Sequence, residues 1–337
     1  MADGPAFFDG VESADETTNG GRHTLRDLMF DAERRLAGAG VPSPQADAAL
    51  LMAWVLDVPR NRLFLHDRPT ASQRMQFEKA VARRLSRVPL QHITGRAAFR
   101  RIELAVGPVV FIPRPETELV AEVGIRALRE ASDGTAVDLC AGSGALGLSL
   151  ALEAPGSSVY LVEWDATALE WTKRNVAGYR EALASVESTA EVIAADAGDV
   201  ASVGQPLSGL AGSIDVVCAN PPYIPDAMVP REIEVRDHDP AISLFGGADG
   251  LDLIRRIARM AAILLRPGGL LVIEHADVQG PDADGGGVVG ILHEAILDDD
   301  LAMLVPGLPG DRLFTSVTDR LDLAGLPRFT LATRADR

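Results

Sequence analysis

The chain has 337 residues, 47% of them hydrophobic, and a formal net charge of −16 at pH 7. This length is enough for two domains, no apolar run reaches the roughly 18 to 20 residues of a membrane span, and the N-terminus lacks a basic region followed by an apolar stretch, so we expect a cytoplasmic protein. The acidic balance disfavours binding to DNA or RNA, because surface carboxylates repel the phosphate backbone.

The chain begins with an acidic segment that is followed by short helical patterns. Residues 1–21 carry five acids and no base, which predicts a disordered tail. Residues 22–88 predict a small helical domain, in which Ser43-Pro44 and a capping box of Thr70 with Gln73 mark two helix starts. Two sets of apolar residues each follow one face of a 3.6-residue period: Leu25, Leu28, Met29 and Leu36, then Phe77, Val81, Leu85 and Val88. The domain either docks a partner or only stabilises the chain.

Residues 89–115 lose the helical period and predict a β-hairpin linker. Residues that favour strands occur at 92–94, 102–106 and 109–112. The next motif, Arg114-Pro115-Glu116-Thr117-Glu118, predicts a helix start. Proline suits a first helical turn, and the two acids complement the positive end of the helix dipole.

From Gly134 onward, strand and helix patterns alternate, which predicts an α/β fold with a doubly wound, mostly parallel sheet. The expected strands are 136–139, 159–162, 192–195, 214–219 and 270–274, and the expected helices are 145–152, 166–176 and 251–265. Residues 280–287 predict a loop, and residues 314–317 and 328–332 predict a closing β pair. The two cysteines, Cys140 and Cys218, are expected to be free thiols, and we expect no metal site.

A glycine-rich turn between the first strand and the first helix of this sheet predicts a cofactor site. Residues 142–147 fit the pattern G-x-G-x-x-G, and Glu163 ends the next strand, where an acid can accept hydrogen bonds from ribose hydroxyls. These features suit any adenosine-containing cofactor, including NAD. The acid Asp138 beside the turn favours the cationic S-adenosylmethionine, since it would repel a pyrophosphate. Asp196, within reach of an adenine edge, and the helix, turn and strand at 265–274 also favour S-adenosylmethionine over a nicotinamide.

The tetrapeptide Asn220-Pro221-Pro222-Tyr223 follows the apolar run 214–219, where parallel sheets bind ligands. The Asn220 side-chain oxygen and the Pro221 carbonyl can accept hydrogen bonds from a planar NH2 group, and Tyr223 can cover that group. The prolines fix the backbone in extended angles. The alternative is an ordinary proline-rich turn at a strand end.

These motifs together resemble the release factor glutamine methyltransferase family. The resemblance extends from Thr24 onward and rests on the glycine turn, the Asn-Pro-Pro-Tyr tetrapeptide and three further motifs. Those motifs are Pro-Leu-Gln-His-Ile-Thr-Gly at 89–95 followed by Phe99, Ile-Pro-Arg-Pro-Glu-Thr-Glu at 112–118, and Gly-Gly-Ala-Asp-Gly-Leu at 246–251. The family implies a Rossmann-like class I methyltransferase sheet in residues 116–337 with an antiparallel C-terminal strand, and S-adenosylmethionine as cofactor.

The resemblance also implies which residues act. The family methylates the side-chain amide of the glutamine in the Gly-Gly-Gln loop of peptide chain release factors, and its helical domain docks the factor. The implied cofactor-binding residues are Asp138, Cys140, Ala141, Gly142, Ser143, Gly144, Glu163, Asp196, Ala197 and Asn220. The implied substrate-binding residues are Asn220, Pro221, Pro222, Tyr223, Phe99 and Arg114. Asn220, Pro221 and Tyr223 are the expected catalytic residues, with both amide hydrogens accepted by Asn220 and the Pro221 carbonyl. We expect a monomer that binds neither nucleic acid nor membrane.

The sequence departs from the family pattern at three places and by a long C-terminal insertion around residues 280–310. The family often has glycine at the position of Cys140, an aromatic residue at that of Ala197, and Arg-Phe-Glu-Pro where this chain has 236–240, Arg-Asp-His-Asp-Pro. Two other functions stay open at this point. One is a methyltransferase for another amide or amine, such as a ribosomal-protein glutamine or an adenine amine. The other is a factor-binding module without activity.

Overall fold

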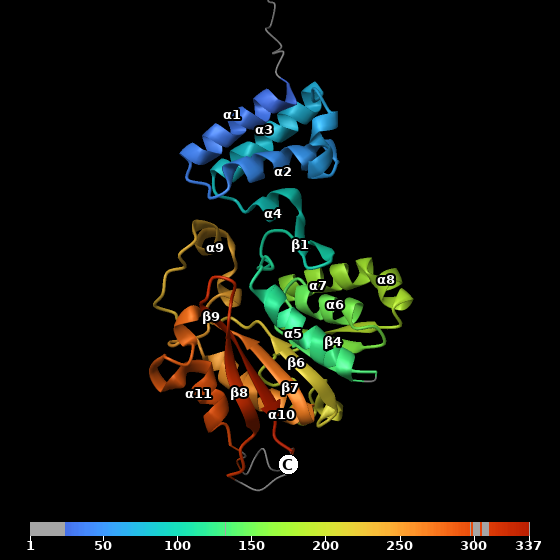
Figure 1. Ribbon diagram of the computed structural model, residues 1–337, viewed down its shortest axis with the longest axis vertical. Helices are drawn as coiled ribbons and strands as arrows, with labels where there is room; N and C mark the ends of the chain where they lie inside the picture. Colours follow the sequence, from blue (N-terminus) through green and yellow to red (C-terminus); the bar gives the residue numbers. More distant parts are fainter. Residues whose placement is uncertain (1–23, 132, 297, 299–303, 305–309, 337) are drawn as a thin grey trace, which may run out of the picture. The chain divides into compact units, whose positions relative to one another are not determined.

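The computed structural model in Figure 1 describes residues 24–131, 133–296, 298, 304 and 310–336. The predicted tail at 1–21 lies outside the described residues. The chain divides into two compact units, Met1–Ser86 and Arg87–Arg337.

The first unit is a small helical bundle. Its elements are α1 (Leu25–Gly38), α2 (Pro44–Leu56), the 3-10 helix η1 (Arg60–Leu65) and α3 (Ala71–Leu85). The predicted capping box of Thr70 with Gln73 is confirmed, and Pro44 begins α2 as predicted. The side chains of Leu36, Leu51 and Phe77 are fully buried between the helices. Burial of these apolar faces stabilises helices that would be marginal alone.

Residues 87–116 begin the second unit with a short helix and a hairpin. Strands β1 (Arg96–Phe99) and β2 (Ile102–Ala105) pair antiparallel. The predicted strand at 92–94 is wrong, because these residues belong to α4 (Leu90–Thr94), which ends at Gly95 in the left-handed conformation with φ 75°. The predicted strand at 109–112 is also wrong. Val110 and Ile112 are buried in the core without strand pairing, so burial explains their apolar character.

The second unit is built on a seven-stranded sheet in the order β5-β4-β3-β6-β7-β9-β8. Five strands are parallel: β3 (Thr135–Leu139), β4 (Ser158–Glu163), β5 (Thr189–Ala194), β6 (Ile214–Ala219) and β7 (Leu265–Glu274). The predicted closing pair is confirmed as β8 (Phe314–Leu321) and β9 (Pro327–Arg334), and β9 runs antiparallel to β7. The predicted α/β fold with a mostly parallel sheet is therefore confirmed.

Helices cover both faces of the sheet, because alternate strand residues point to opposite sides. Val137 and Val217 pack in one core with α10 (Asp252–Leu264), whereas Ala136 and Val216 pack in the other with α5 (Thr117–Glu130) and α6 (Ala145–Glu153). The remaining helices, also visible in Figure 1, are α7 (Ala166–Gly178), α8 (Arg180–Ser185), α9 (Ile233–His238) and α11 (Gly287–Glu294). Short 3-10 turns lie at Ser208–Leu210, Ala241–Ser243, Asp277–Gln279 and Asp284–Gly286.

Three local predictions need correction. Helix α5 begins at Thr117, so Pro115 lies in the preceding turn and not in the first helical turn. The turn expected at 266–269 is part of strand β7, which shifts register against β6 between Ile214 and Val216 and contains Gly268 at φ 75°. The loop expected at 280–287 contains a 3-10 turn and the first residue of α11.

Candidate active site

The chain order reverses between β3 and β6, and a large cavity lies at the carboxyl ends of the strands there. Successive strands run outward from β3 to β5, and the chain then returns to β6 on the other side of β3. Loops at such a reversal separate and leave a crevice, the usual ligand site of an open parallel sheet. The cavity here has a volume of about 910 Å³.

The glycine turn after β3 forms one wall of the cavity. The backbone is left-handed at Cys140, Gly142 and Gly144, with φ of 70°, 58° and 84°. A Cβ on Gly142 would meet no atom within 4 Å, so the turn leaves open space in the cavity. Cys140 adopts a conformation that favours glycine, which is the residue the family often has there.

Two buried acids stand beside this turn. Asp138 is 1% exposed, and its Oδ2 accepts a hydrogen bond from the Gly147 amide at 2.8 Å. Its Oδ1 is buried without a partner, and burial raises the pKa of Asp138 to about 7. Glu163 accepts hydrogen bonds from the amides of Gly142 and Asp165, both at 2.8 Å, and burial raises its pKa. The unpartnered Asp138 oxygen fits a ligand that carries a positive charge or a donor.

The loop after β5 contributes Asp196 and Ala197. Asp196 accepts a hydrogen bond from the Gly198 amide at 2.8 Å and pairs with Arg256 at 2.7 Å. Ala197 offers little surface, but Trp164 also lines the cavity and is 68% exposed. Trp164 was not among the predicted site residues, although an aromatic residue directly after Glu163 was an available signal.

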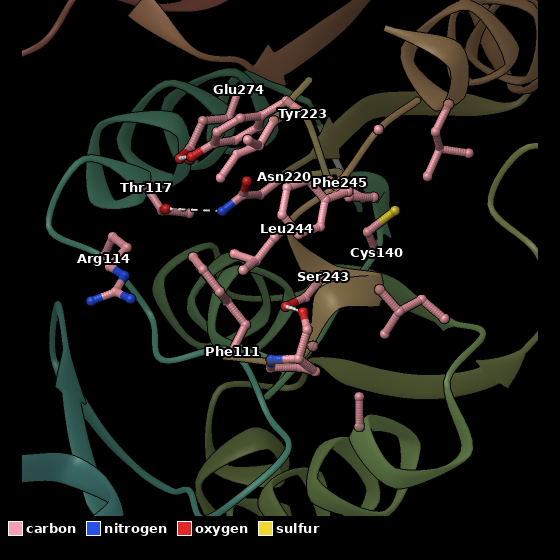
Figure 2. A pocket seen from close by; sticks show the side chains of 18 of the residues that line it. Phe111, Arg114, Thr117, Cys140, Asn220, Tyr223, Ser243, Leu244, Phe245 and Glu274 are labelled. Carbon is pink, nitrogen blue, oxygen red and sulfur yellow. Dashed lines mark hydrogen bonds between the residues drawn. The ribbon is translucent and has the colours of Figure 1, made fainter. Parts of the chain in front are cut away.

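The Asn-Pro-Pro-Tyr tetrapeptide forms the opposite wall. Asn220 Nδ2 donates a hydrogen bond to Thr117 Oγ1 at 3.2 Å, as the dashed line in Figure 2 shows. The backbone of the tetrapeptide is fixed by Gln279, whose Nε2 donates to the Tyr223 carbonyl at 2.8 Å. Pairing of Ile224 with the neighbouring segment at Leu244 fixes the next residue. Asn220, Pro222 and Tyr223 line the cavity, whereas Pro221 is buried beside it.

A buried carboxyl lies behind the tetrapeptide. Glu274, the last residue of β7, is 1% exposed and lines the cavity. The Tyr223 hydroxyl donates to Glu274 Oε1 at 3.4 Å, and burial raises the pKa of Glu274 to about 7. Neither Glu274 nor Thr117 was among the predicted site residues. An acid at the end of an apolar strand and a threonine inside the 112–118 motif were the available signals.

Arg114 lines the cavity on the side of the hairpin. Its guanidinium lies 5.1 Å from the Phe111 ring centre and pairs with Asp239 at 2.7 Å. Burial raises the pKa of Asp239 to about 6. Asp239, the partner of Arg114, therefore lies in the segment 236–240, where the sequence departs from the family pattern.

The structure brings most of the predicted site residues together. Those that line the cavity are Arg114, Asp138, Cys140, Ala141, Gly142, Ser143, Glu163, Asp196, Ala197, Asn220, Pro222 and Tyr223. Gly144 and Pro221 adjoin it without lining it. The prediction that Phe99 contacts substrate is not supported, because its side chain is 1% exposed and packs in the core with Leu104. Phe111 is the aromatic residue of this segment that lines the cavity.

Comparison with known proteins agrees with this geometry. Residues 27–95 match the family model described as PrmC N-terminal domain, and residues 116–234 match that described as methyltransferase small domain. The chain is 44% identical to the release factor glutamine methyltransferase of Streptomyces coelicolor over 91% of this chain and 97% of the relative. The relative of that name from Mycolicibacterium smegmatis is 42% identical, over 93% and 99% of the two chains.

The sheet, the cavity at its reversal point and the matched methyltransferase model define a class I methyltransferase, for which S-adenosylmethionine is the methyl donor. More narrowly, the chain belongs to the release factor glutamine methyltransferase family. Within the described residues, no helix is both long and apolar enough to cross a membrane.

Proposed function

We propose that this protein transfers a methyl group from S-adenosylmethionine to the side-chain amide nitrogen of the glutamine in the Gly-Gly-Gln motif of peptide chain release factors. The observation that carries this proposal is the Asn220 amide, held by Thr117 in the same cavity as the buried acids Asp138 and Glu163. One wall suits a cationic cofactor, and the other suits a planar amide. The family of the chain supports the choice of substrate.

The cofactor half of the cavity has groups for each part of S-adenosylmethionine. Asp138 and the turn from Cys140 to Gly144 would hold the amino acid moiety, and Glu163 would accept hydrogen bonds from the ribose hydroxyls. Asp196, Ala197 and the exposed ring of Trp164 would contact the adenine. When bound, the cofactor supplies a methyl group activated by a sulfonium.

The substrate half must activate a poor nucleophile, since the lone pair of an amide nitrogen is delocalised into its carbonyl. Asn220 Oδ1 and the Pro221 carbonyl accept the two amide hydrogens and so draw electron density toward the nitrogen. The nitrogen would bond to the methyl carbon as the carbon–sulfur bond breaks, and it would then lose one of its two protons to water. Pro222 and Tyr223 pack against the amide plane, and Arg114 contacts the substrate chain. Holding the nitrogen in line with the methyl group can contribute up to roughly 7 to 11 kcal/mol.

The helical domain, residues 22–88, serves in this proposal as the docking module for the release factor. Its exposed apolar side chains support a role in protein binding, because large apolar groups at a surface favour contact with a partner. These residues are Phe30 at 62%, Phe64 at 82%, Leu65 at 65% and Met75 at 62% exposure. The linker 89–115 connects it to the catalytic domain, 116–337. The protein works as a cytoplasmic monomer that binds the factor without contacting nucleic acid.

The test is transfer of labelled methyl from S-adenosylmethionine to a purified release factor. The control is the same factor with the glutamine of its Gly-Gly-Gln motif replaced. Label on the intact factor and none on the altered factor is the expected result. Bound cofactor with no label on either factor would contradict the proposal and direct the search to other protein substrates.

A further inference from the structure

We infer that Thr117 and Glu274 are positioning residues that determine which end of the Asn220 side-chain amide faces the substrate nitrogen. This inference rests on the proposed function, since it requires an NH2 group as the target. The two ends of the Asn220 amide have almost the same size but opposite chemistry. Oδ1 accepts a hydrogen bond, whereas Nδ2 donates one and would meet the substrate NH2 group hydrogen to hydrogen.

Thr117 selects the orientation through its single hydroxyl proton. Asn220 Nδ2 donates to Thr117 Oγ1 at 3.2 Å, so Oδ1 is the end left for the cavity. This arrangement needs Thr117 to direct its own proton to another acceptor. If the Thr117 proton pointed at Asn220, the amide would turn and present Nδ2 to the substrate.

Glu274 is the acceptor that completes the chain of hydrogen bonds. Ala219 of β6 pairs with Ile273 of β7, so the residues that follow them, Asn220 and Glu274, are neighbours at the ends of the two strands. The nearby Thr117 hydroxyl lowers the pKa of the Glu274 carboxyl, so the two groups lie close together. Glu274 Oε2 is buried and accepts no hydrogen bond from the described residues, so it is the acceptor that is available to the Thr117 proton. Figure 2 shows Glu274 and Tyr223 together beside the Thr117–Asn220 pair.

The ionisation state of Glu274 therefore sets the donor-to-acceptor direction of the hydrogen bonds among Asn220, Thr117 and Glu274. An ionised carboxylate can only accept, which orders the donors as Asn220 Nδ2 to Thr117 and Thr117 to Glu274. A protonated carboxyl can donate to Thr117 and permits the reversed order. Arg328 on β9 favours the ionised form, and Glu116 opposes it. The Tyr223 hydroxyl donates to Oε1 and also favours ionisation.

The experiment compares the wild-type protein with Thr117→Val, which keeps the shape of the side chain without its hydroxyl, and Thr117→Ser, which restores the hydroxyl. We expect Thr117→Val to lower kcat for methyl transfer to a release factor by about 10- to 100-fold, because the acceptor is no longer held in place. The KM for the factor and the Kd for S-adenosylmethionine should change by less than about twofold. Thr117→Ser should recover most of the rate.

The second variant is Glu274→Gln, read by its pH profile. For the wild type at saturating S-adenosylmethionine, where the pH dependence of cofactor binding does not contribute, kcat/KM for the release factor should rise as pH increases through about 7, where the buried Glu274 carboxyl ionises. In Glu274→Gln this rise should disappear and the rate should stay low. A matched control is Thr330→Val, which removes another buried hydroxyl, on β9 and outside the cavity lining. It should lower Tm but leave kcat unchanged.

The outcomes separate the two proposals. A wild-type protein that binds cofactor but labels no release factor overturns the proposed function and this inference with it. An active wild type with equal kcat in Thr117→Val overturns this inference alone. A loss in Thr117→Val that Thr117→Ser does not recover, together with an unchanged pH profile in Glu274→Gln, also overturns it and indicates a purely structural role. If Thr117→Val does not fold, the pH profile of Glu274→Gln decides.

Discussion

Replacement of Asn220 by alanine tests the central step of the proposed mechanism. The side chain reaches the cavity at the end of β6, and its Nδ2 donates a hydrogen bond to Thr117 Oγ1 at 3.2 Å. Alanine removes Oδ1, one of the two proposed acceptors for the substrate amide, and leaves the Pro221 carbonyl. Because the side chain is only half-buried, the fold should lose little more than one hydrogen bond, about 1 kcal/mol.

The expected loss of activity is much larger than the expected loss of stability. Removing one hydrogen-bonding group that acts on the charge developing in a transition state typically costs about 10²- to 10³-fold in kcat, or about 2.7 to 4 kcal/mol. Affinity for S-adenosylmethionine should stay within about threefold, because the acids that would hold the cofactor are on β3 and β4. The loss should therefore appear in the chemical step.

The assay is a single turnover of labelled methyl to a release factor with both ligands saturating. Cofactor affinity is measured by calorimetry and Tm by thermal unfolding of the same samples. A rate for Asn220→Ala within about threefold of the wild type would refute the assignment of Oδ1 as an acceptor. A large loss of cofactor affinity would instead assign Asn220 to the cofactor half.

Three further predictions concern the cofactor turn and the helical unit. Affinity for S-adenosylmethionine should increase as pH rises through about 7, because the Asp138 carboxyl must ionise to pair with a cation. Calorimetry of Asp138→Asn should show weaker binding with a flatter pH dependence. An unchanged pH profile would exclude Asp138 as the partner of the cation. Cys140→Gly should keep Tm within a few degrees or raise it, because φ at this position is 70° and glycine lacks the strained Cβ. Cys140→Val should lose about 1 to 2 kcal/mol, because a β-branched side chain tolerates this φ less well than cysteine does. Asp47→Ala should lower the free energy of unfolding in urea by up to about 3 to 5 kcal/mol, because it removes the carboxylate that pairs with the buried Arg84 at 2.7 Å. A loss below about 1 kcal/mol would mean that the other interactions of Arg84 compensate its charge.

Several features of this protein follow from local sequence alone. The strand that ends at Glu163, the helix after Gly144 and the capping box at Thr70 all depend on neighbouring residues, and all three are found in the structure. The glycine turn and the Asn-Pro-Pro-Tyr tetrapeptide were predictable for the same reason. Each is a short motif that follows an apolar strand, and parallel strands bring such endings to one edge of a sheet.

Local sequence was misleading where apolar residues are buried without belonging to a sheet. Residues 92–94 and 109–112 have the composition of strands, yet one segment is helical and the other is an unpaired stretch with buried side chains. Phe99 lies in a motif of the family but is a core residue. Composition reports that a side chain is buried, but it does not report whether the burial comes from a sheet, a helix or a loop.

The sequence by itself determined the α/β order, the glycine turn after β3 and the Asn-Pro-Pro-Tyr tetrapeptide after β6, because each depends on residues that are close along the chain. Only the tertiary structure decided the partners of these groups. Thr117 and Asn220 are 103 residues apart, and Tyr223 and Glu274 are 51 apart. Their contacts depend on the order and register of β6 and β7 and on the position of α5. No local pattern encodes that register, since it is fixed by the packing of the whole sheet.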